Sequence, residues 1–305
     1  DIRNILDFEK DYPDAVVIRL EQNYRSTGNI IKAAGEVVRN NSGRKDKTMW
    51  TANPHGEPVS HYTAGDEQDE AMFVADGISR LHKTEERSYK EFAVLYRVNA
   101  QSRVIEDRLM REGIPYALVG GLKFYDRAEI KDILAYLKVL ANPADSVSLR
   151  RVINTPVRGI GNVTVEKIEK YAVENHMMLY DAIGMIVNEP LLPNGTRLKV
   201  KAFHEMMERL RTMSERRGVG RLAEGVLEET GYIRSLEAEN TEDALSRVEN
   251  LQEFISAAEE FDETAEERTL GAFLDRVALV SAVDSPAGES DRVTLMTLHS
   301  AKGLE

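Results

Sequence analysis

The chain has 305 residues, of which 42% are hydrophobic and 30% charged, enough for a substantial core and about two domains. It contains no cysteine, which excludes disulfides, thiolate metal sites and cysteine nucleophiles and fits a reducing cytoplasm. No apolar stretch approaches the roughly 20 residues that cross a bilayer, and the chain begins without a basic and apolar leader, so we expect a cytoplasmic protein outside membranes.

The net charge of −12 is unusual for a protein that binds nucleic acid, because phosphate contacts need Lys and Arg. The charges are, however, segregated along the chain. Basic residues dominate between Arg197 and Arg221, and acidic residues dominate between Glu237 and Glu267. This pattern predicts either a basic track on one surface with acidic helices elsewhere, or two ordinary solvated helix faces.

The N-terminal part of the chain alternates between strand and helix patterns. The predicted strands are 16–20, 59–63, 92–96 and 116–119, and the predicted helices are about 28–39, 66–82 and 102–112, with Asp66 or a neighbour capping the second. The run at 92–96 is continuously apolar, as in a parallel strand that is covered on both faces. The βα repeat predicts an α/β fold with a doubly wound parallel sheet.

The pattern changes after Gly121. Helical periods continue from Ala128 to about Val280 almost without a strand pattern, and an apolar strand returns at 293–298. Because α/β patterns flank the helical stretch, we expect an all-α domain inserted into the α/β domain, with 286–290 as the return linker.

The first candidate functional segment is 20–27, between a predicted strand and a predicted helix, where open parallel sheets place ligand-contacting residues. Tyr24 can stack on a base, and Arg25 can neutralise charge on a transferring phosphoryl group. The same residues are also explained by an ordinary turn in which Ser26 or Thr27 caps the helix.

The second candidate segment, 96–103, again joins a strand to a helix. Arg97 and Asn99 can reach a phosphate, and the helix N-terminus adds amide donors for an anion. Asn99 also suits a plain helix cap. A DNA-contacting loop and a simple capped turn therefore both remain open for this segment.

The third candidate segment, 155–164, contains a Gly159-Ile160-Gly161 turn before a helix. Such a turn exposes backbone N–H groups with no side chain in the way, so a DNA phosphate can approach closely. It resembles the turn of helix-hairpin-helix modules, which grip duplex backbones without reading sequence. The alternative is a glycine-rich connection between two helices.

The fourth candidate segment, 294–305, is a strand that delivers His299, Ser300 and Lys302 at its carboxyl end, followed by Gly303. His299 is the histidine that we expect to be functional. The six histidines are otherwise scattered without metal-ligand spacing, so no metal site is expected in this chain.

Five segments follow one another in the chain: LEQNYRST, YRVNAQSR, VGGLKFYDRAEIKD, NTPVRGIG and VTLMTLHSAKGLE. In this order and spacing they resemble the UvrD/Rep/PcrA group of superfamily 1 DNA helicases, most closely its PcrA branch from Gram-positive bacteria. The resemblance covers essentially the whole chain. It implies a RecA-like motor lobe of the P-loop NTPase type at 1–122 and 287–305, with an inserted all-α duplex-binding domain at 123–286.

The resemblance also implies roles for single residues. Tyr24 stacks on the adenine of ATP, Arg25 contacts the γ-phosphate as a catalytic arginine finger, and Glu305 approaches the ribose. Single-stranded DNA runs along Arg97, Asn99 and His299. The residues implied to hold the duplex are Thr155, Arg158, Gly159, Ile160 and Gly161.

The family's phosphate-binding pattern, Gly-x-x-x-x-Gly-Lys-Ser/Thr, is absent from this sequence, as are its acidic metal-binding motif and its late second arginine motif. The resemblance therefore implies that ATP is held together with a lobe outside this chain, which also supplies the Mg²⁺ ligands. We expect a fragment that does not hydrolyse ATP alone, from a parent enzyme that unwinds DNA in the 3′ to 5′ direction.

Two alternatives remain open: a non-enzymatic DNA- or protein-binding regulatory module, and a nuclease-coupled relative with a further carboxylate-rich domain. The resemblance implies single-stranded and duplex DNA as partners, together with the remaining segments of the same helicase. It also implies RNA polymerase, repair proteins or a plasmid replication initiator as partners, and DNA repair and replication as the setting.

Overall fold

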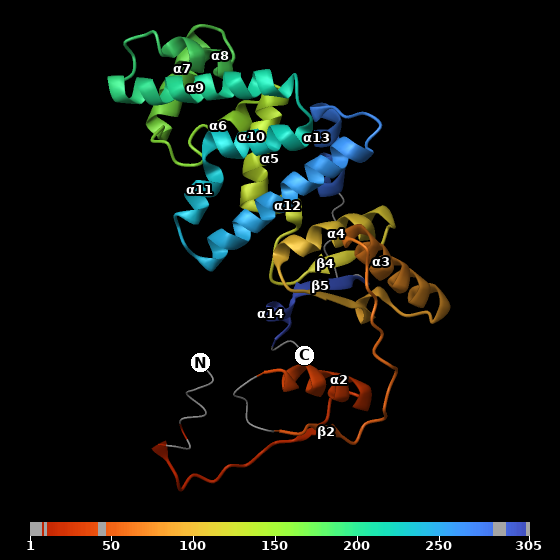
Figure 1. Ribbon diagram of the computed structural model, residues 1–305. Coiled ribbons are helices and arrows are strands. Elements are labelled where there is room, and N and C mark those ends of the chain that lie inside the picture. The colour runs from red at the N-terminus through yellow and green to blue at the C-terminus, as the bar shows by residue number, and fades with distance from the viewer. Residues whose placement is uncertain (1–7, 9–10, 42–46, 283–290, 303–305) are drawn as a thin grey trace. The chain divides into compact units, whose positions relative to one another are not determined.

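In the computed structural model, the described residues are 8, 11–41, 47–282 and 291–302 (Figure 1). The contacts within the chain divide it into two compact units, Asp1–Ala64 and Gly65–Glu305. No helix in the described ranges is both long and apolar enough to cross a membrane. The predicted return linker at 286–290 lies outside these ranges.

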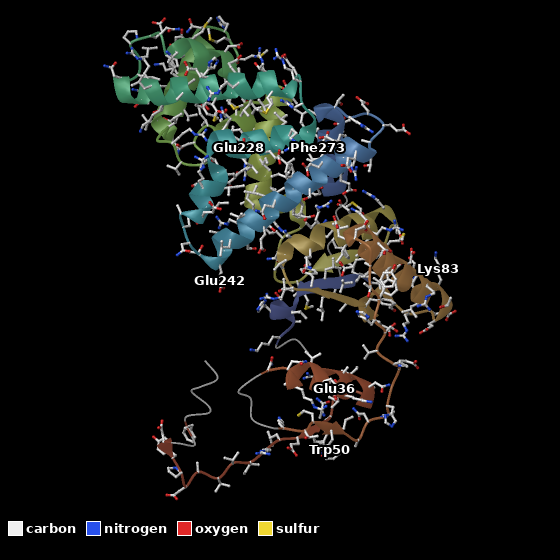
Figure 2. All side chains as sticks on the ribbon, viewed as in Figure 1. Glu36, Trp50, Lys83, Glu228, Glu242 and Phe273 are labelled. Carbon is white, nitrogen blue, oxygen red and sulfur yellow. The ribbon has the colours of Figure 1, made fainter. Side chains whose placement is uncertain are left out.

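The first unit is built around two short parallel strands, β1 (Gln22–Asn23) and β2 (Trp50–Thr51). Helix α2 (Gly28–Arg39) follows β1, which confirms the predicted helix. No side chain of α2 is buried, and Trp50, labelled in Figure 2, is half exposed. The described part of this unit therefore has little core of its own.

Two strands predicted in the first unit are wrong. Residues 16–20 and 59–63 form no strand, and the side chains of Val16 and Leu20 are 86% and 78% exposed. Their β-branched and aromatic residues favour a strand, but a strand is stable only when its backbone groups pair with a neighbour. Neither run has such a neighbour in the part of the chain that the structure describes.

The second unit contains a parallel sheet of β3 (Ala93–Tyr96), β5 (Val293–Thr297) and β4 (Tyr116–Leu118), in the order β3-β5-β4. The three strands confirm three predictions. The expectation that β3 is covered on both faces is wrong, because Leu95 is exposed while Tyr96 is buried. Since side chains alternate along a strand, β3 has one covered face.

Helices α3 (Glu67–Thr84) and α4 (Ser102–Arg111) complete the core of the sheet and confirm two predicted helices. Asp66 caps α3 as expected, with its carboxylate accepting from the Asp69 amide at 2.8 Å. The sheet core is formed by apolar side chains from both helices and all three strands: Ala75, Ile78, Tyr96, Leu109, Tyr116, Val293 and Leu295.

The rest of the second unit is helical, which confirms the predicted all-α stretch. Its helices are α5 (Ala128–Ala141), α6 (Ser146–Val152), α7 (Asn162–Glu174), α8 (Leu179–Ile186), α9 (Asn194–Ser214), α10 (Val219–Thr230), α11 (Tyr232–Glu237), α12 (Glu242–Thr264) and α13 (Leu270–Ala282). They share a second hydrophobic core, the helical core. Within it Phe273, labelled in Figure 2, packs edge-on against Phe254 and Phe261.

The connection between β4 and β5 places the helices in the fold. These two strands are neighbours in the sheet, although α5 to α13 lie between them in the chain (Figure 1). The chain thus leaves the sheet after an edge strand and returns to its central strand. This arrangement confirms the predicted fold class, a parallel α/β part combined with an all-α part. The exact boundaries at 122/123 and 286/287 stay predictions.

Candidate functional site

Three connections meet at the carboxyl edge of the β3-β5-β4 sheet. Tyr96 and Thr297, the last residues of β3 and β5, are register partners. The chain after β4 continues beside β5, because the Val119 amide donates to the Leu295 carbonyl at 2.9 Å. Segments 97–101, 119–122 and 298–302 therefore start side by side, at the edge where open α/β sheets bind ligands.

Two of the residues predicted to contact single-stranded DNA touch each other at this edge. The Nη1 atom of Arg97 lies 3.3 Å from the Nδ1 atom of His299, and both side chains are exposed. Asn99, the third, is half-buried and lies in the same loop as Arg97. The fold thus gathers the three predicted residues in one unit and directly joins two of them.

The loop 97–101 is held in shape by a residue that we did not predict. The Gln101 side-chain oxygen accepts from the backbone amides of Arg97 at 2.9 Å and Val98 at 3.2 Å. This leaves the Arg97 side chain outside the turn. The available sequence signal was the spacing of a capping box, with Gln101 three residues after Val98, although Val98 is not the Ser or Thr that usually begins such a box.

The connection after β4 packs closely on the short helix α14 (Leu298–Ala301). Gly120 has a φ of +76°, and a Cβ atom there would lie 2.9 Å from the Ser300 hydroxyl oxygen. Thr297 caps α14, accepting from the Ser300 amide at 3.1 Å. A glycine at position 120 is therefore needed both for its backbone conformation and for the approach of these two connections.

In the first unit, Tyr24 and Arg25 follow β1 in a tight turn. The Asn23 carboxamide oxygen accepts from the amides of Arg25 at 3.0 Å and Ser26 at 2.8 Å. Asn53 donates to the carbonyls of Tyr24 and Ser26 at 3.2 Å each. The side chains of Asn23 and Asn53 thus hold the backbone of this turn through hydrogen bonds. Neither residue was among the predicted site residues.

The side chains of this turn face solvent. Tyr24 is 78% exposed, and its hydroxyl donates to Gln22 at 3.0 Å; Arg25 is also exposed. Thr27 occupies the N-cap position of α2 but makes no side-chain cap hydrogen bond. An accessible aromatic face beside a guanidinium suits a base and a phosphate, so the turn fits one wall of a nucleotide site.

Two other expectations concern the nucleotide and metal. Glu305, predicted to approach the ribose, lies outside the described residues. Within the described ranges, no three His, Asp or Glu side chains are grouped so that they can hold a metal ion.

The predicted duplex-binding residues lie in one turn before α7, which we call the glycine turn (154–161). The Asn154 side-chain oxygen accepts from the amides of Arg158 at 3.0 Å and Ile160 at 3.1 Å. Gly159 has a φ of +77°, where side chains are disfavoured. Asn154 therefore folds the turn from within, and its signal in the sequence was the preference of Asn for turns.

Two side chains of the glycine turn point into the protein. Ile160 is buried in the helical core. The Arg158 guanidinium donates to the Thr155 carbonyl at 2.9 Å and to the Tyr136 hydroxyl at 2.7 Å, and it lies over the Phe203 ring. Arg158 thus stabilises the turn through its hydrogen bonds. Because the Ile160 side chain is buried, only its backbone groups are available to a ligand.

The end of the glycine turn is open. Gly161 is the N-cap of α7, has no side-chain cap hydrogen bond, and has an extended backbone with φ −79°. No other atom lies within 4 Å of where its Cβ would be. The first amides of α7 can therefore be approached by an anion without a steric barrier from the protein.

The basic run that begins at Arg197 is partly neutralised in the fold. Arg209 pairs with Glu229 at 2.8 Å, Lys201 lies 3.8 Å from Glu205, and Arg221 pairs with Glu224. Lys199 is exposed and lies against Gly159. Lys199 therefore places a positive charge beside the glycine turn. The other three basic residues form ion pairs on the protein surface.

Known proteins resemble this chain throughout its length. A family model for the UvrD-like helicase C-terminal domain matches residues 18–305. The chain is 46% identical over 311 residues to "ATP-dependent DNA helicase PcrA" of Bacillus subtilis (strain 168). It is 47% identical over 307 residues to proteins of the same name from Staphylococcus aureus (strain Mu50) and Staphylococcus epidermidis. Each alignment covers 100% of this chain and 42% of the relative's length.

Proposed function

This chain belongs to the UvrD-like helicase family, and on that premise we propose that it supplies the second motor lobe and the helical insertion of an ATP-dependent 3′ to 5′ DNA helicase. The match over residues 18–305 carries the proposal, since it includes both the sheet and the helices. Residues 1–122 and 287–305 are assigned to the lobe and 123–286 to the insertion. Because the phosphate-binding lysine pattern is absent, the chain alone is assigned no ATP hydrolysis.

In this proposal Tyr24 and Arg25 contact ATP, and Glu305 approaches its ribose by family resemblance. The exposed Tyr24 ring stacks on the adenine, and the exposed Arg25 guanidinium contacts the γ-phosphate. ATP supplies the phosphoryl group that is transferred to water. Arg25 stabilises the negative charge that develops during that transfer, as an arginine finger does, and the Mg²⁺ ligands come from outside this chain.

Arg97, Asn99 and His299 form the proposed contact with single-stranded DNA. The support is their position at the carboxyl edge of a parallel sheet, with Arg97 and His299 adjacent and exposed. An arginine donates to phosphate oxygens, and Asn and His donate to phosphate or base edges. The chemistry of all three side chains fits a polyanionic strand.

The glycine turn is the proposed contact with duplex DNA. The support is the open N-terminus of α7 at Gly161 and the exposed Lys199 beside Gly159. Thr155, Arg158 and Ile160 contribute by shaping the turn and through backbone groups. The function proposed for the parent protein is unwinding in DNA repair and replication in the cytoplasm, with RNA polymerase, repair proteins or a replication initiator as partners by family resemblance.

An Arg25→Ala substitution in the full-length protein tests the enzymatic part. We expect DNA-stimulated ATP hydrolysis to fall by about 10³-fold or more, because an arginine finger acts mainly in the transition state. DNA affinity should stay within about two-fold, since Arg25 is not placed on the DNA path. Arg19→Ala, an exposed arginine six positions away, is the matched control. Unchanged turnover in Arg25→Ala would contradict the arginine-finger role of Arg25. Absence of DNA-stimulated ATP hydrolysis in the unaltered full-length protein would favour the non-enzymatic binding module.

A further inference from the structure

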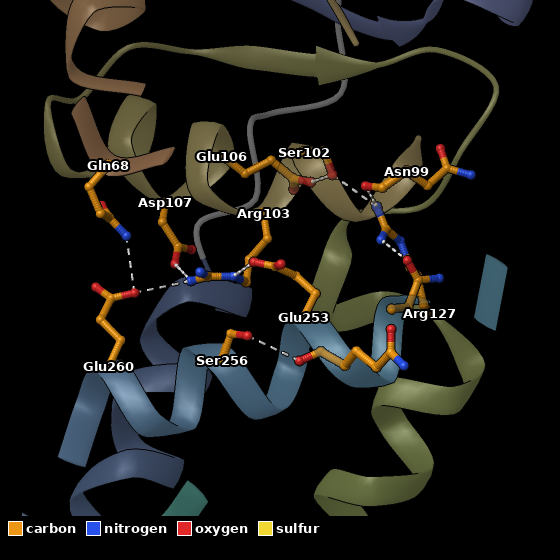
Figure 3. Close-up of polar contacts among 12 residues, drawn as sticks. Gln68, Asn99, Ser102, Arg103, Glu106, Asp107, Arg127, Glu253, Ser256 and Glu260 are labelled. Carbon is orange, nitrogen blue, oxygen red and sulfur yellow. Dashed lines mark hydrogen bonds and ion pairs between the residues drawn. The ribbon is translucent and has the colours of Figure 1, made fainter. Parts of the chain in front are cut away.

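The sheet core and the helical core of the second unit are separate hydrophobic clusters. Polar and charged side chains, buried or half-buried, lie between them (Figure 3). We call this set the polar joint; it consists of Ser102, Arg103, Glu106, Arg127, Glu129, Asn250, Glu253 and Glu260. Because hydrogen bonds depend on direction, such a joint fixes relative position more tightly than apolar contact alone.

Arg127 lies at one end of the polar joint, beside Asn99 and Ser102 (Figure 3), and is 7% exposed. Its Nη2 atom donates to the backbone carbonyl of Asn99 at 3.1 Å and to the Ser102 hydroxyl at 2.9 Å. Its Nη1 atom donates to the Asn250 side-chain oxygen on α12 at 2.7 Å. One planar guanidinium therefore bridges the 97–101 loop and a helix about 150 residues further along the chain.

The hydrogen bonds continue on both sides of Arg127. The Asn250 amide donates to Glu129 on α5 at 2.6 Å. The Ser102 hydroxyl donates to Glu106 at 2.6 Å. A connected, buried path thus runs from α5 through α12 and Arg127 to the start of α4. Removing the guanidinium would leave the Asn99 carbonyl and the Asn250 oxygen without their buried donor.

We propose that Arg127 is a positioning residue that ties the 97–101 loop to helix α12, so that the helical part of the protein sets the position of Asn99. The inference rests on the proposed function, in which this loop contacts single-stranded DNA. Arg127 holds the Asn99 backbone, and the Asn99 side chain points away from it (Figure 3). The DNA-facing group therefore stays available while its backbone is fixed.

Arg103 offers a matched control in the same polar joint. It is also buried, and it pairs with Glu253, with Asp107 at 3.3 Å and with Glu260 at 3.5 Å. These partners lie on α12 and α4, with none in the 97–101 loop. Substitutions at Arg103 therefore perturb the joint without releasing the loop.

The test compares Arg127→Lys with Arg103→Lys in the full-length protein. Each keeps the positive charge but cannot reproduce the planar fork of donors. Two quantities are measured. The first is the kcat of ATP hydrolysis at saturating single-stranded DNA, and the second is the half-saturating DNA concentration, at which the rate of ATP hydrolysis is half of its maximum. We expect Arg127→Lys to raise that concentration by about ten-fold with kcat little changed, and Arg103→Lys to raise it less than about two-fold.

Two further variants separate the possible failures. Asn250→Ala removes the α12 partner of Arg127 and should also raise the half-saturating DNA concentration. If Arg127→Lys does not fold, Asn250→Ala tests the same connection in its place. Equal behaviour of the two lysine variants, or an unchanged value in Asn250→Ala, overturns the positioning role. If Asn99→Ala leaves the half-saturating concentration unchanged, the proposed single-strand contact fails and the positioning role fails with it.

Discussion

Arg97 and His299 are 202 positions apart in the chain, yet the Arg97 Nη1 atom lies 3.3 Å from the His299 Nδ1 atom. A guanidinium can only donate, so in this contact Arg97 donates and the Nδ1 atom accepts, as in the imidazole tautomer that carries its proton on Nε2. The pair therefore presents an arginine and an Nε2–H donor next to each other at the sheet edge. This geometry leads to the first prediction.

Arg97→Ala and His299→Ala should each weaken single-stranded DNA binding by the full-length protein, and their effects should not add. We expect an interaction energy of about 0.5–1.5 kcal/mol in the double-mutant cycle, because each residue orients the other. Arg97→Ala should also make the slope of the logarithm of the binding constant against the logarithm of the salt concentration shallower by about 0.7. This is the change expected for the loss of one phosphate contact on single-stranded DNA. DNA binding titrated at several salt concentrations measures both quantities.

His82→Ala is the control for the cycle, since His82 lies at the end of α3 and stacks on Tyr89. It should leave the affinity and its salt slope unchanged. Additive effects of Arg97→Ala and His299→Ala would show that the contact between them has no role in binding.

The two glycines of the glycine turn should respond differently to substitution. Gly159→Ala should lower the free energy of unfolding of the chain by about 1–3 kcal/mol, because its φ of +77° is strained for any residue with a Cβ atom. Gly161→Val should change it by less than about 1 kcal/mol, since its backbone is extended and the space is open. Urea unfolding measures both.

Duplex affinity should nevertheless fall in Gly161→Val, because the new methyl groups stand where a phosphate would approach the first amides of α7. Gly195→Ala, at another open position, is the control and should bind duplex as the unaltered chain does. If Gly161→Val binds duplex DNA normally at low salt, the glycine turn is a helix connection without a DNA contact.

Glu106 should make the stability of the protein fall as pH rises. Burial raises the pKa of this carboxyl to about 7, although the Ser102 hydroxyl and the Arg127 guanidinium favour its ionised form. In the unfolded chain the group loses its proton near its usual pKa of about 4.3. Between these two values the folded state binds more protons than the unfolded state, so stability decreases with rising pH and then levels off above about pH 7.

Glu106→Gln should remove this decrease, which is on the order of 3 kcal/mol across the window. The measurement is urea unfolding of the chain at a series of pH values between about 4.5 and 7.5, taken as the difference between variant and unaltered chain. Glu85→Gln, a substitution of a surface carboxylate paired with Arg87, is the control. A Glu106→Gln curve parallel to that of the unaltered chain would contradict the prediction.

The local elements of this protein are determined by its sequence. The helices at 28–39 and 102–111 and the strands at 93–96 and 293–297 follow from the apolar spacing within each segment. The family, too, is evident from five short segments in order. These features depend on neighbours in the chain, so a local pattern is sufficient to predict them.

Pairing between distant segments was decided by the tertiary structure. The apolar run at 16–20 has the composition of a strand but no partner among the described residues, whereas β5 finds its place between β3 and β4. Likewise, Ile160 reads as part of an exposed turn, yet its side chain is buried in the helical core. Whether a strand pairs or a side chain is buried depends on the partner surface, which the segment itself does not encode.

The same holds for the candidate sites. The sequence singled out Arg97, Asn99 and His299 as separate residues at strand ends, but only the fold joins Arg97 to His299 and places Arg127 behind Asn99. Bridging side chains such as Arg127 leave no local pattern, because their partners lie far away in the chain, here at Asn99 and Ser102 before Arg127 and at Asn250 on α12 after it. The sequence thus determined which side chains are available at the proposed DNA contacts, and the tertiary structure decided how those side chains are held together.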